Sequence, residues 1–160
     1  MSGPSAGRMS TTSDVFGGGS ELMYALVSRR KDLTTHADAK DERMDRRAFF
    51  DELYEAFNRR DIDAVLATMS DEVDWPNAWK GGRLIGREAV RDYWTAQWAE
   101  IDPHVEPLSV AERRDGSQAV TVRQVVRSAD LQLLGDREVV HVYRLDGGLI
   151  RRMDVEEPEQ

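Results

Sequence analysis

The sequence contains no cysteine and no apolar run long enough to cross a membrane as a helix. Without thiols the chain cannot form disulfides, a zinc ribbon or a cysteine nucleophile. A membrane-spanning helix needs about 20 consecutive apolar residues, so no membrane partner is expected. Lysine and arginine number 22 against 30 aspartates and glutamates, which gives a formal net charge of −8. Because phosphate backbones are bound by clustered cations, nucleic acid is not the expected partner.

The length and composition are those of one domain of ordinary size. The chain has 160 residues, of which 40% are hydrophobic and 32% are charged. A compact domain usually takes about 100–150 residues. These values predict a soluble, acidic, cytoplasmic protein with a single folded domain.

The chain divides near residue 44. Residues 1–20 are dominated by serine, threonine and glycine, a composition too poor in apolar residues to form a core. No basic region precedes an apolar run, so a secretory signal is not indicated. We therefore expect residues 1–43 to be a disordered leader or an upstream extension, and residues 44–158 to be the domain. The alternative is a peptide around residues 22–27 that becomes ordered when it binds a partner.

Helical spacing characterises the first part of the domain. Apolar side chains recur at this spacing from Phe49 to Phe57. Asp61 is suited to cap a second short helix that extends to Met69. Two short strands, at 73–75 and 84–85, are then expected, and Gly86 opens a third helix.

After Pro103 the spacing changes to the two-residue alternation of strands. Four strands are expected, at residues 105–111, 119–127, 138–145 and 149–155. Asp-Gly and Asp-Gly-Gly sequences between them suit tight hairpins. Helices followed by antiparallel strands predict an α+β fold with the helices on one face of the sheet.

Motifs for cofactors and metals are not found. Residues 81–86 have the span of a phosphate loop, but the lysine and hydroxyl that would contact phosphate and magnesium do not follow. No two histidines have the helical spacing of a zinc site, and Ser109 and Ser128 lack a nucleophile elbow. The sequence therefore indicates no cofactor and no metal, although a site formed by His104, His141 and a carboxylate stays geometrically possible.

On the predicted strands, some polar residues have the same phase as apolar ones, which means that they point to the same face of the sheet. Gln124 shares a phase with valines, and so do His141 and Tyr143 on the next strand. On a concave sheet face covered by helices, such residues line a pocket. Each also has a structural explanation: a dimer face for Gln124, a hydrogen-bonded core position for His141 and a packed ring for Tyr143.

Two aspartates stand where strands favour apolar residues. Asp154 lies between Met153 and Val155, and Asp74 lies in a similar setting in the first strand. A carboxyl group in apolar surroundings has a raised pKa and can act as an acid or base near neutral pH. The alternative is a strand-end carboxylate paired with Arg152. The phase of the last strand that faces the pocket is left open.

The order of these elements resembles the nuclear transport factor 2-like cone and, within it, the SnoaL-like proteins related to polyketide cyclases and ketosteroid isomerases. The resemblance covers residues 45–157. It is carried by the helix start Gly-Arg-Glu-Ala-Val at 86–90 and by the closing segment 147–155. It implies a cone-shaped, strongly curved mixed or antiparallel sheet wrapped by three N-terminal helices. It also implies a small-molecule ligand and a homodimer paired through the sheet.

Functional residues are transferred from this family only where the motifs match. In SnoaL-type cyclases a His-Trp-Asp run on the last strand supplies an acid/base aspartate. Asp154 takes the place of that aspartate, whereas Arg152 and Met153 replace its companions. In ketosteroid isomerases a base aspartate directly precedes a proline. Trp75 holds that place here, and Asp74, one residue earlier, is expected to point away from the cavity, which disfavours steroid isomerisation.

Two functions are compatible with these residues. The first is a small-molecule-binding SnoaL-like protein of uncharacterised substrate, without established catalysis. The residues expected to line its pocket are Trp75, Trp79, Tyr93, Trp94, Gln124, Tyr143 and Arg152. The alternative is a metal-free acid/base enzyme, such as a cyclase, isomerase, dehydratase or hydrolase, that acts on a small apolar or aromatic substrate. In that enzyme Asp154 shuttles a proton, and His141 or Tyr143 stabilises a developing enolate by hydrogen bonding.

Overall fold

The computed structural model describes residues 39–159, and the fold below is that of the unit from Arg46 onward. The predicted leader lies, up to residue 38, outside the described residues. A first helix covers residues 39–58, and it buries Phe50, Leu53 and Tyr54. In the described part of the chain, no helix is both long and apolar enough to span a membrane.

Two further helices follow, each with a start that the sequence indicates. Helix α2 (Ile62–Leu66) is capped by Asp61, whose carboxylate accepts a hydrogen bond from the amide of Ala64 at 3.2 Å. Helix α3 (Arg87–Glu100) begins after Gly86, which has a φ of 96°, a conformation that favours glycine. The predicted extension of the second helix to Met69 is wrong: this side chain is fully buried in the first strand.

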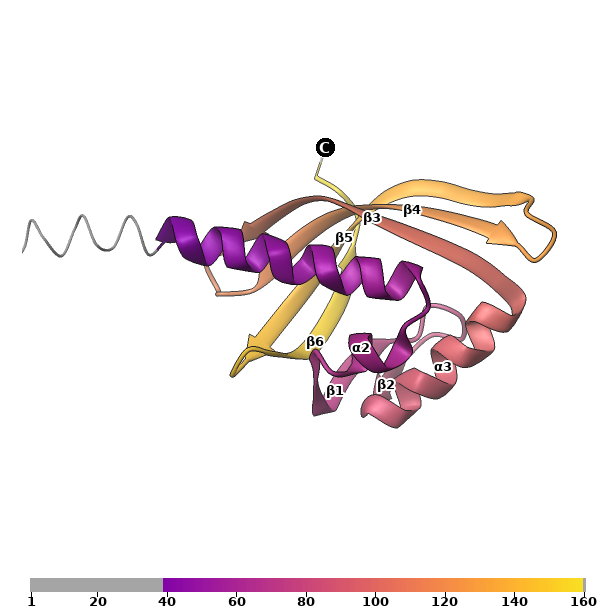
Figure 1. Cartoon of the computed structure of the whole chain (residues 1–160), viewed down its shortest axis with the longest axis horizontal. Coiled ribbons are helices and arrows are strands. Elements are labelled where there is room, and N and C mark those ends of the chain that lie inside the picture. The colour runs from indigo at the N-terminus through magenta and orange to yellow at the C-terminus, as the bar shows by residue number, and fades with distance from the viewer. Residues whose placement is uncertain (1–38, 160) are drawn as a thin grey trace, which may run out of the picture. The chain divides into compact units, whose positions relative to one another are not determined.

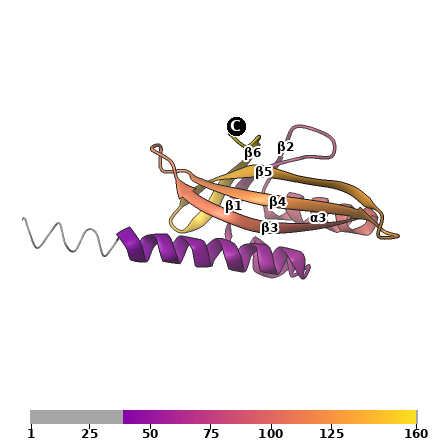
Figure 2. The same cartoon turned by 90° about the horizontal axis from the view of Figure 1, so that it is seen from above.

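Six strands form one sheet in the order β2-β1-β6-β5-β4-β3. Their bounds are β1 Met69–Pro76, β2 Arg83–Ile85, β3 Ile101–Glu112, β4 Gln118–Ser128, β5 Leu133–Asp146 and β6 Leu149–Glu156. Strands β1 and β6 run parallel, and the other pairs are antiparallel. The curved, unclosed mixed sheet with N-terminal helices confirms the predicted fold class (Figures 1 and 2).

The edges of the sheet explain where its prolines are tolerated. Strand β3 pairs only with β4. Because it has no neighbouring strand on its other side, it can tolerate Pro103 and Pro107, which have no N–H to donate. The register shifts between Pro107 and Ser109, as is common for an irregular edge strand. The two prolines are therefore consistent with the position of β3 at one edge of the sheet.

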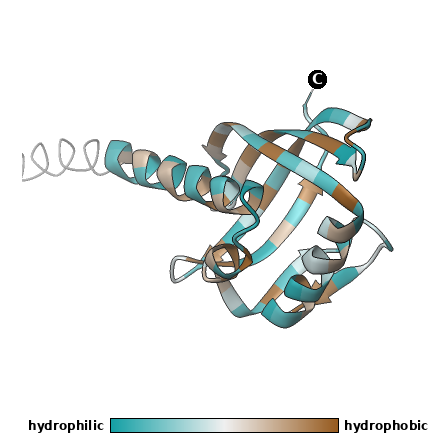
Figure 3. Cartoon of the chain, turned by 45° about the vertical axis from the view of Figure 1, so that its right-hand side comes forward, coloured by the Kyte–Doolittle hydropathy of each residue, from teal (hydrophilic) through white to brown (hydrophobic). Residues whose placement is uncertain are grey.

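Alternation along the strands separates a core face from an outer face. Figure 3 shows hydrophobic and hydrophilic residues following one another along the strands. Val120, Val122 and Val139 are fully buried, in contact with the core residues of the helices. Because successive side chains point to opposite faces, the inward set meets the helices, and these are the positions that build the site.

Candidate functional site

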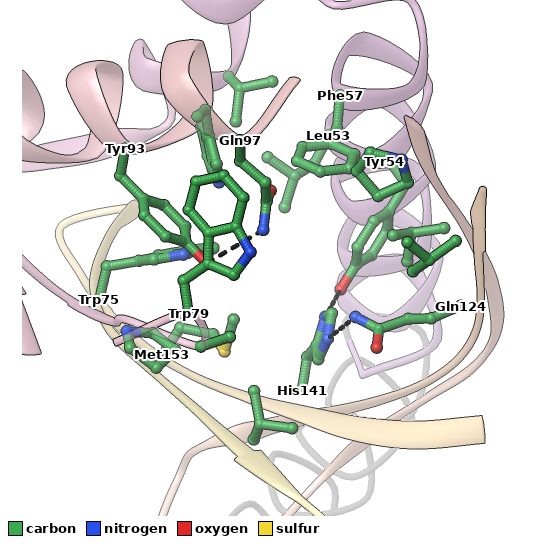
Figure 4. Close-up of a pocket in the computed structure, with 18 of the residues that line it drawn as sticks. Leu53, Tyr54, Phe57, Trp75, Trp79, Tyr93, Gln97, Gln124, His141 and Met153 are labelled. Atoms are coloured by element: carbon green, nitrogen blue, oxygen red, sulfur yellow. Dashed lines mark hydrogen bonds between the residues drawn. The ribbon is translucent and has the colours of Figure 1, made fainter. Parts of the chain in front are cut away.

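A cavity of about 280 Å³ is lined by the helices and the inner face of the sheet (Figure 4). The first helix contributes Leu53, Tyr54 and Phe57, and α3 contributes Tyr93, Trp94 and Gln97. The strands add mainly apolar and aromatic residues. No aspartate, glutamate, lysine or arginine occurs among the described residues that line the cavity.

Hydrogen-bonded polar groups cluster at one side of the cavity. The hydroxyl oxygens of Tyr54 and Tyr143 are 2.7 Å apart, and the Tyr54 oxygen is 2.9 Å from Nδ1 of His141. Nε2 of His141 lies 3.2 Å from the amide nitrogen of Gln124. Figure 4 shows Gln124, His141 and Tyr54 pointing toward one another from two strands and the first helix.

Burial keeps this cluster uncharged. Desolvation lowers the pKa of His141 from 6.5 to about 4, so the imidazole is neutral at pH 7. Desolvation likewise raises the pKa of Tyr54, and the nearby Tyr143 raises it further. The pKa of Tyr143 is raised by burial, against a smaller opposing effect of its hydrogen bond with Tyr54. The cluster therefore offers neutral donors and acceptors, and no formal charge.

A second pair of polar groups lies on the opposite side of the cavity, on α3. The amide nitrogen of Gln97 donates to the hydroxyl of Tyr93 at 3.1 Å (Figure 4). Burial is the main cause that raises the pKa of Tyr93. The ring of Trp79 packs edge-on against Tyr93 at 6.3 Å between centroids and is 40% exposed, which places Trp79 at the rim.

Aromatic rings form the wall between the two polar groups. The rings of Trp75 and Trp94 meet edge to face with centroids 5.4 Å apart. Trp98 stacks on Trp94 from behind, at 5.8 Å and 16°, with the guanidinium carbon of Arg60 5.0 Å from its centroid. Trp98 itself is not a lining residue, so it supports the wall and does not form it.

The structure brings most of the sequence-predicted residues together. The predicted residues found around the cavity are Trp75, Trp79, Tyr93, Trp94, Gln124, His141 and Tyr143. Two polar residues were missed, Tyr54 and Gln97. Tyr54 lies within the aromatic stripe of the first helix, where its hydroxyl gives no separate signal. Gln97 follows Tyr93 by one helical turn, and that spacing could have indicated the pair.

Arg152 and Asp154 do not line the cavity. Of the two interpretations of Asp154, the raised pKa is wrong and the alternative, a carboxylate paired with Arg152, is confirmed. The hydrogen bond from Arg152 is the main cause that lowers the pKa of this carboxyl. Nε and Nη2 of Arg152 donate to its two oxygens at 2.8 and 3.0 Å, and Arg83 adds a bond at 3.1 Å. The physical reason is strand phase: Met153 and Val155 line the cavity, so the residues that alternate with them face outward.

Asp74 belongs to the same outward network. Its carboxylate accepts hydrogen bonds from Arg83 at 2.6 Å and from Arg152 at 2.9 Å. Its neighbour Trp75 lines the cavity. The expectation that Asp74 points away from the cavity is confirmed, and a base in the manner of ketosteroid isomerase is not formed at this position.

Residues suited to hold a metal are not assembled. Within residues 39–159, no group of three histidine, aspartate or glutamate side chains is placed to bind an ion. His104 lies in an outer cleft beside Arg47 and Asp51, and His141 lies in the cavity. The site with His104 and His141 that the sequence left open therefore does not form.

Solved structures share this fold at low sequence identity. A nuclear transport factor 2-like protein of unknown function from Burkholderia pseudomallei is 23% identical, with a TM-score of 0.59 over 68% of this chain and 87% of its own. A proposed polyketide cyclase from Xanthomonas campestris is 23% identical, with a TM-score of 0.58 over 71% and 90%. At this identity the likeness concerns the fold.

A third structure contains a ligand. It is a protein from Mycobacterium tuberculosis in complex with estradiol-17β-hemisuccinate, 20% identical, with a TM-score of 0.57 over 64% of this chain and 85% of its own. No curated protein matches the chain. The SnoaL-like domain model matches residues 50–153. This span includes residues 50–58 of the first helix, α2, α3 and all of the sheet except the end of β6. On this match, the chain belongs to the family of SnoaL-like domains.

Proposed function

We propose that this protein binds a small, uncharged, largely apolar ring molecule in the cavity, as a binding protein without catalysis. The observation that carries the proposal is a lining of apolar and aromatic side chains without a charged group among the described residues. Transfer of an ion into such surroundings is unfavourable because no partner replaces its hydration. A neutral ligand does not meet this penalty.

The dimensions support a ligand of about two fused rings. A cavity of about 150 Å³ lined by apolar residues can hold benzene, and this cavity has about 280 Å³. Trp75 and Trp94 provide flat surfaces for stacking or edge contacts. The relative bound to estradiol-17β-hemisuccinate supports the choice of a ring-containing molecule.

Acid/base catalysis is the weaker candidate. The lining contains no carboxyl group, and Asp154 is held ionised by Arg152 outside the cavity. His141, with a pKa near 4, is a weak base at neutral pH. These observations favour hydrogen bonding of the ligand over proton transfer to it.

Binding is tested with a neutral bicyclic ketone, 1-tetralone, and an anion of similar size, 1-naphthoate, by isothermal titration calorimetry. We expect the ketone to bind at least tenfold more tightly than the anion. Equal affinities would contradict the proposed selection against charge. No binding of either compound would contradict the proposed function itself.

A variant pair locates the binding. Val126 lines the cavity, whereas its neighbour Val125 on the same strand does not. Val126→Trp fills the cavity and should reduce the affinity for 1-tetralone at least tenfold. Val125→Trp adds the same ring to the other face of the sheet and should leave the affinity within twofold. A reversed or equal response would place the ligand elsewhere.

Three features of the protein's organisation are also proposed: its domain bounds, its location in the cell and its oligomeric state. We infer that residues 44–158 form the domain after a leader, that the protein is cytoplasmic, and that it forms a homodimer through the outer face of the sheet. The family resemblance supports the dimer. Light scattering at micromolar concentration should give twice the mass of the chain, and a monomeric mass would contradict pairing.

A further inference from the structure

The four polar side chains at one side of the cavity form an unbranched chain of hydrogen bonds. It runs from Gln124 to His141 at 3.2 Å, from His141 to Tyr54 at 2.9 Å and from Tyr54 to Tyr143 at 2.7 Å. His141 and both tyrosines are buried. Because buried polar groups need partners, the direction in which each member donates depends on its neighbours.

Gln124 determines which atom donates in the first hydrogen bond of this series. Its amide nitrogen faces Nε2 of His141, and an amide nitrogen only donates. The amide turned over would accept from Nε2–H and give the opposite tautomer, whereas in this orientation of the amide Nε2 accepts. A neutral imidazole carries one N–H, which is then at Nδ1 and donates to the Tyr54 oxygen. Burial, which lowers the pKa of His141 to about 4, keeps the imidazole neutral.

Counting hydrogens along the chain leaves one without an acceptor. The Tyr54 oxygen already receives the proton on Nδ1 of His141, and a single contact joins Tyr54 to Tyr143. Two hydroxyl hydrogens share that contact. One of them fills it, and the other has no acceptor among the described residues. With the opposite tautomer, Tyr54 would donate to His141 and Tyr143 to Tyr54, and no hydrogen would be left over.

We propose that Gln124 is a positioning residue that acts through His141. It makes the series of hydrogen bonds donate in the direction of Tyr54 and Tyr143. This direction leaves one hydroxyl hydrogen of the two tyrosines free to donate to a ligand. Both tyrosines line the cavity, so the free donor suits a ketone or quinone oxygen. This inference rests on the proposed binding function and adds the ligand's hydrogen-bonding role. A buried donor without an acceptor is unfavourable, so the site selects for ligands that supply one.

The first test reads the tautomer without a ligand. In the ¹⁵N NMR spectrum of the full chain at pH 7, His141 should carry its proton on Nδ1. In Gln124→Glu the new carboxylate accepts from Nε2, so the proton should move to Nε2. A proton on Nε2 in the unsubstituted protein would overturn the inference, and this measurement needs no variant to fold.

The second test compares 1-tetralone with tetralin, which has the same rings without the carbonyl. The unsubstituted protein should bind the ketone at least tenfold more tightly. Gln124→Glu should lose that preference while its affinity for tetralin stays within threefold. If the preference persists in Gln124→Glu, Gln124 does not set the direction, and the positioning role is overturned while the binding function stands.

A matched control separates the effect of the hydrogen-bond direction from the effect of the added charge. Gln118→Glu makes the same change on β4, the strand of Gln124, at a side chain that does not line the cavity and does not bond to His141. It should retain the preference for the ketone. An equal loss in Gln118→Glu would attribute the effect to charge and overturn the inference. Failure of both compounds to bind the unsubstituted protein would instead contradict the proposed function, and the tautomer would still be read separately.

Discussion

The buried histidine makes the stability of this protein depend on pH in a way that can be calculated. His141 has 5% of its surface exposed, and desolvation lowers its pKa from 6.5 to about 4. In the unfolded chain the imidazole returns to its ordinary value. Well above pH 6.5 it is neutral in both states and contributes no pH dependence. As the pH falls, the unfolded state takes up a proton first, so the folded state loses stability.

The size of the loss follows from the two pKa values. A difference from 6.5 to about 4 corresponds to about 3 kcal/mol, since each pH unit is worth about 1.4 kcal/mol. About 2 kcal/mol of this loss should be present at pH 5, and the loss approaches its full size near pH 4. Since small domains are stable by only about 5–15 kcal/mol, His141 alone should remove a substantial share.

Urea unfolding followed by tryptophan fluorescence between pH 7.5 and 4.5 measures this loss. We expect His141→Gln to be less stable than the unsubstituted protein at pH 7.5, and its stability to fall less steeply toward pH 4.5. Carboxyl groups such as Asp115, whose pKa is lowered to about 2 mainly by Ser117, are common to both proteins and cancel in the comparison.

The exposed histidine provides the control. His104 is solvent-exposed on β3, and His104→Gln should show the same pH dependence as the unsubstituted protein. Parallel pH profiles of the unsubstituted protein and His141→Gln would refute the reasoning, because they would mean that His141 is not held neutral by burial.

Three further outcomes follow from contacts in the structure. Asp154→Asn should leave the affinity for 1-tetralone within twofold, since its partners Arg152 and Arg83 lie outside the cavity; a tenfold loss in calorimetry would contradict this placement. Tyr54→Phe should lower the free energy of unfolding by about 1–3 kcal/mol because it removes two buried hydrogen bonds, and an unchanged urea midpoint would show that these bonds are dispensable. Asp61→Ala should lower the same quantity by about 1 kcal/mol, since its carboxylate caps α2; Asp61→Asn, which keeps an acceptor, should recover most of the loss.

The fold could be predicted from the sequence because each element carries a local signal. The alternation from 119 to 127 matches β4 at Gln118–Ser128 within one residue at each end. The start of strand β5 was harder to predict. The strand begins at Leu133, well before the predicted start at 138. Gly135 and the charged pair after it resemble a loop, but they are paired with β4, so long-range hydrogen bonds override the local composition.

The polar residues that the strands contribute to the site were predictable only where they point to the same sheet face as apolar ones. Gln124, His141 and Tyr143 were found in this way, and the structure places all three at the cavity. The last strand gave no such signal, because Arg152 and Asp154 alternate with an equally plausible inward set. Its register against β5 shifts between Arg144 and Leu145, and an alternation pattern contains no information about a shift of this kind.

Alternation also accounts for the separation of charge from the cavity. On β1, Trp75 lines the cavity while Asp74 joins the outward ion pairs, and on β6, Met153 lines it while Arg152 faces outward. The outward carboxylates are paired with arginines on β2 and β6 and do not line the cavity. The same two strands thus supply a charged exterior and a neutral interior. Under the proposed function, we therefore expect a ligand to be selected by its rings and by a hydrogen bond to the buried polar side chains, and not by an ion pair.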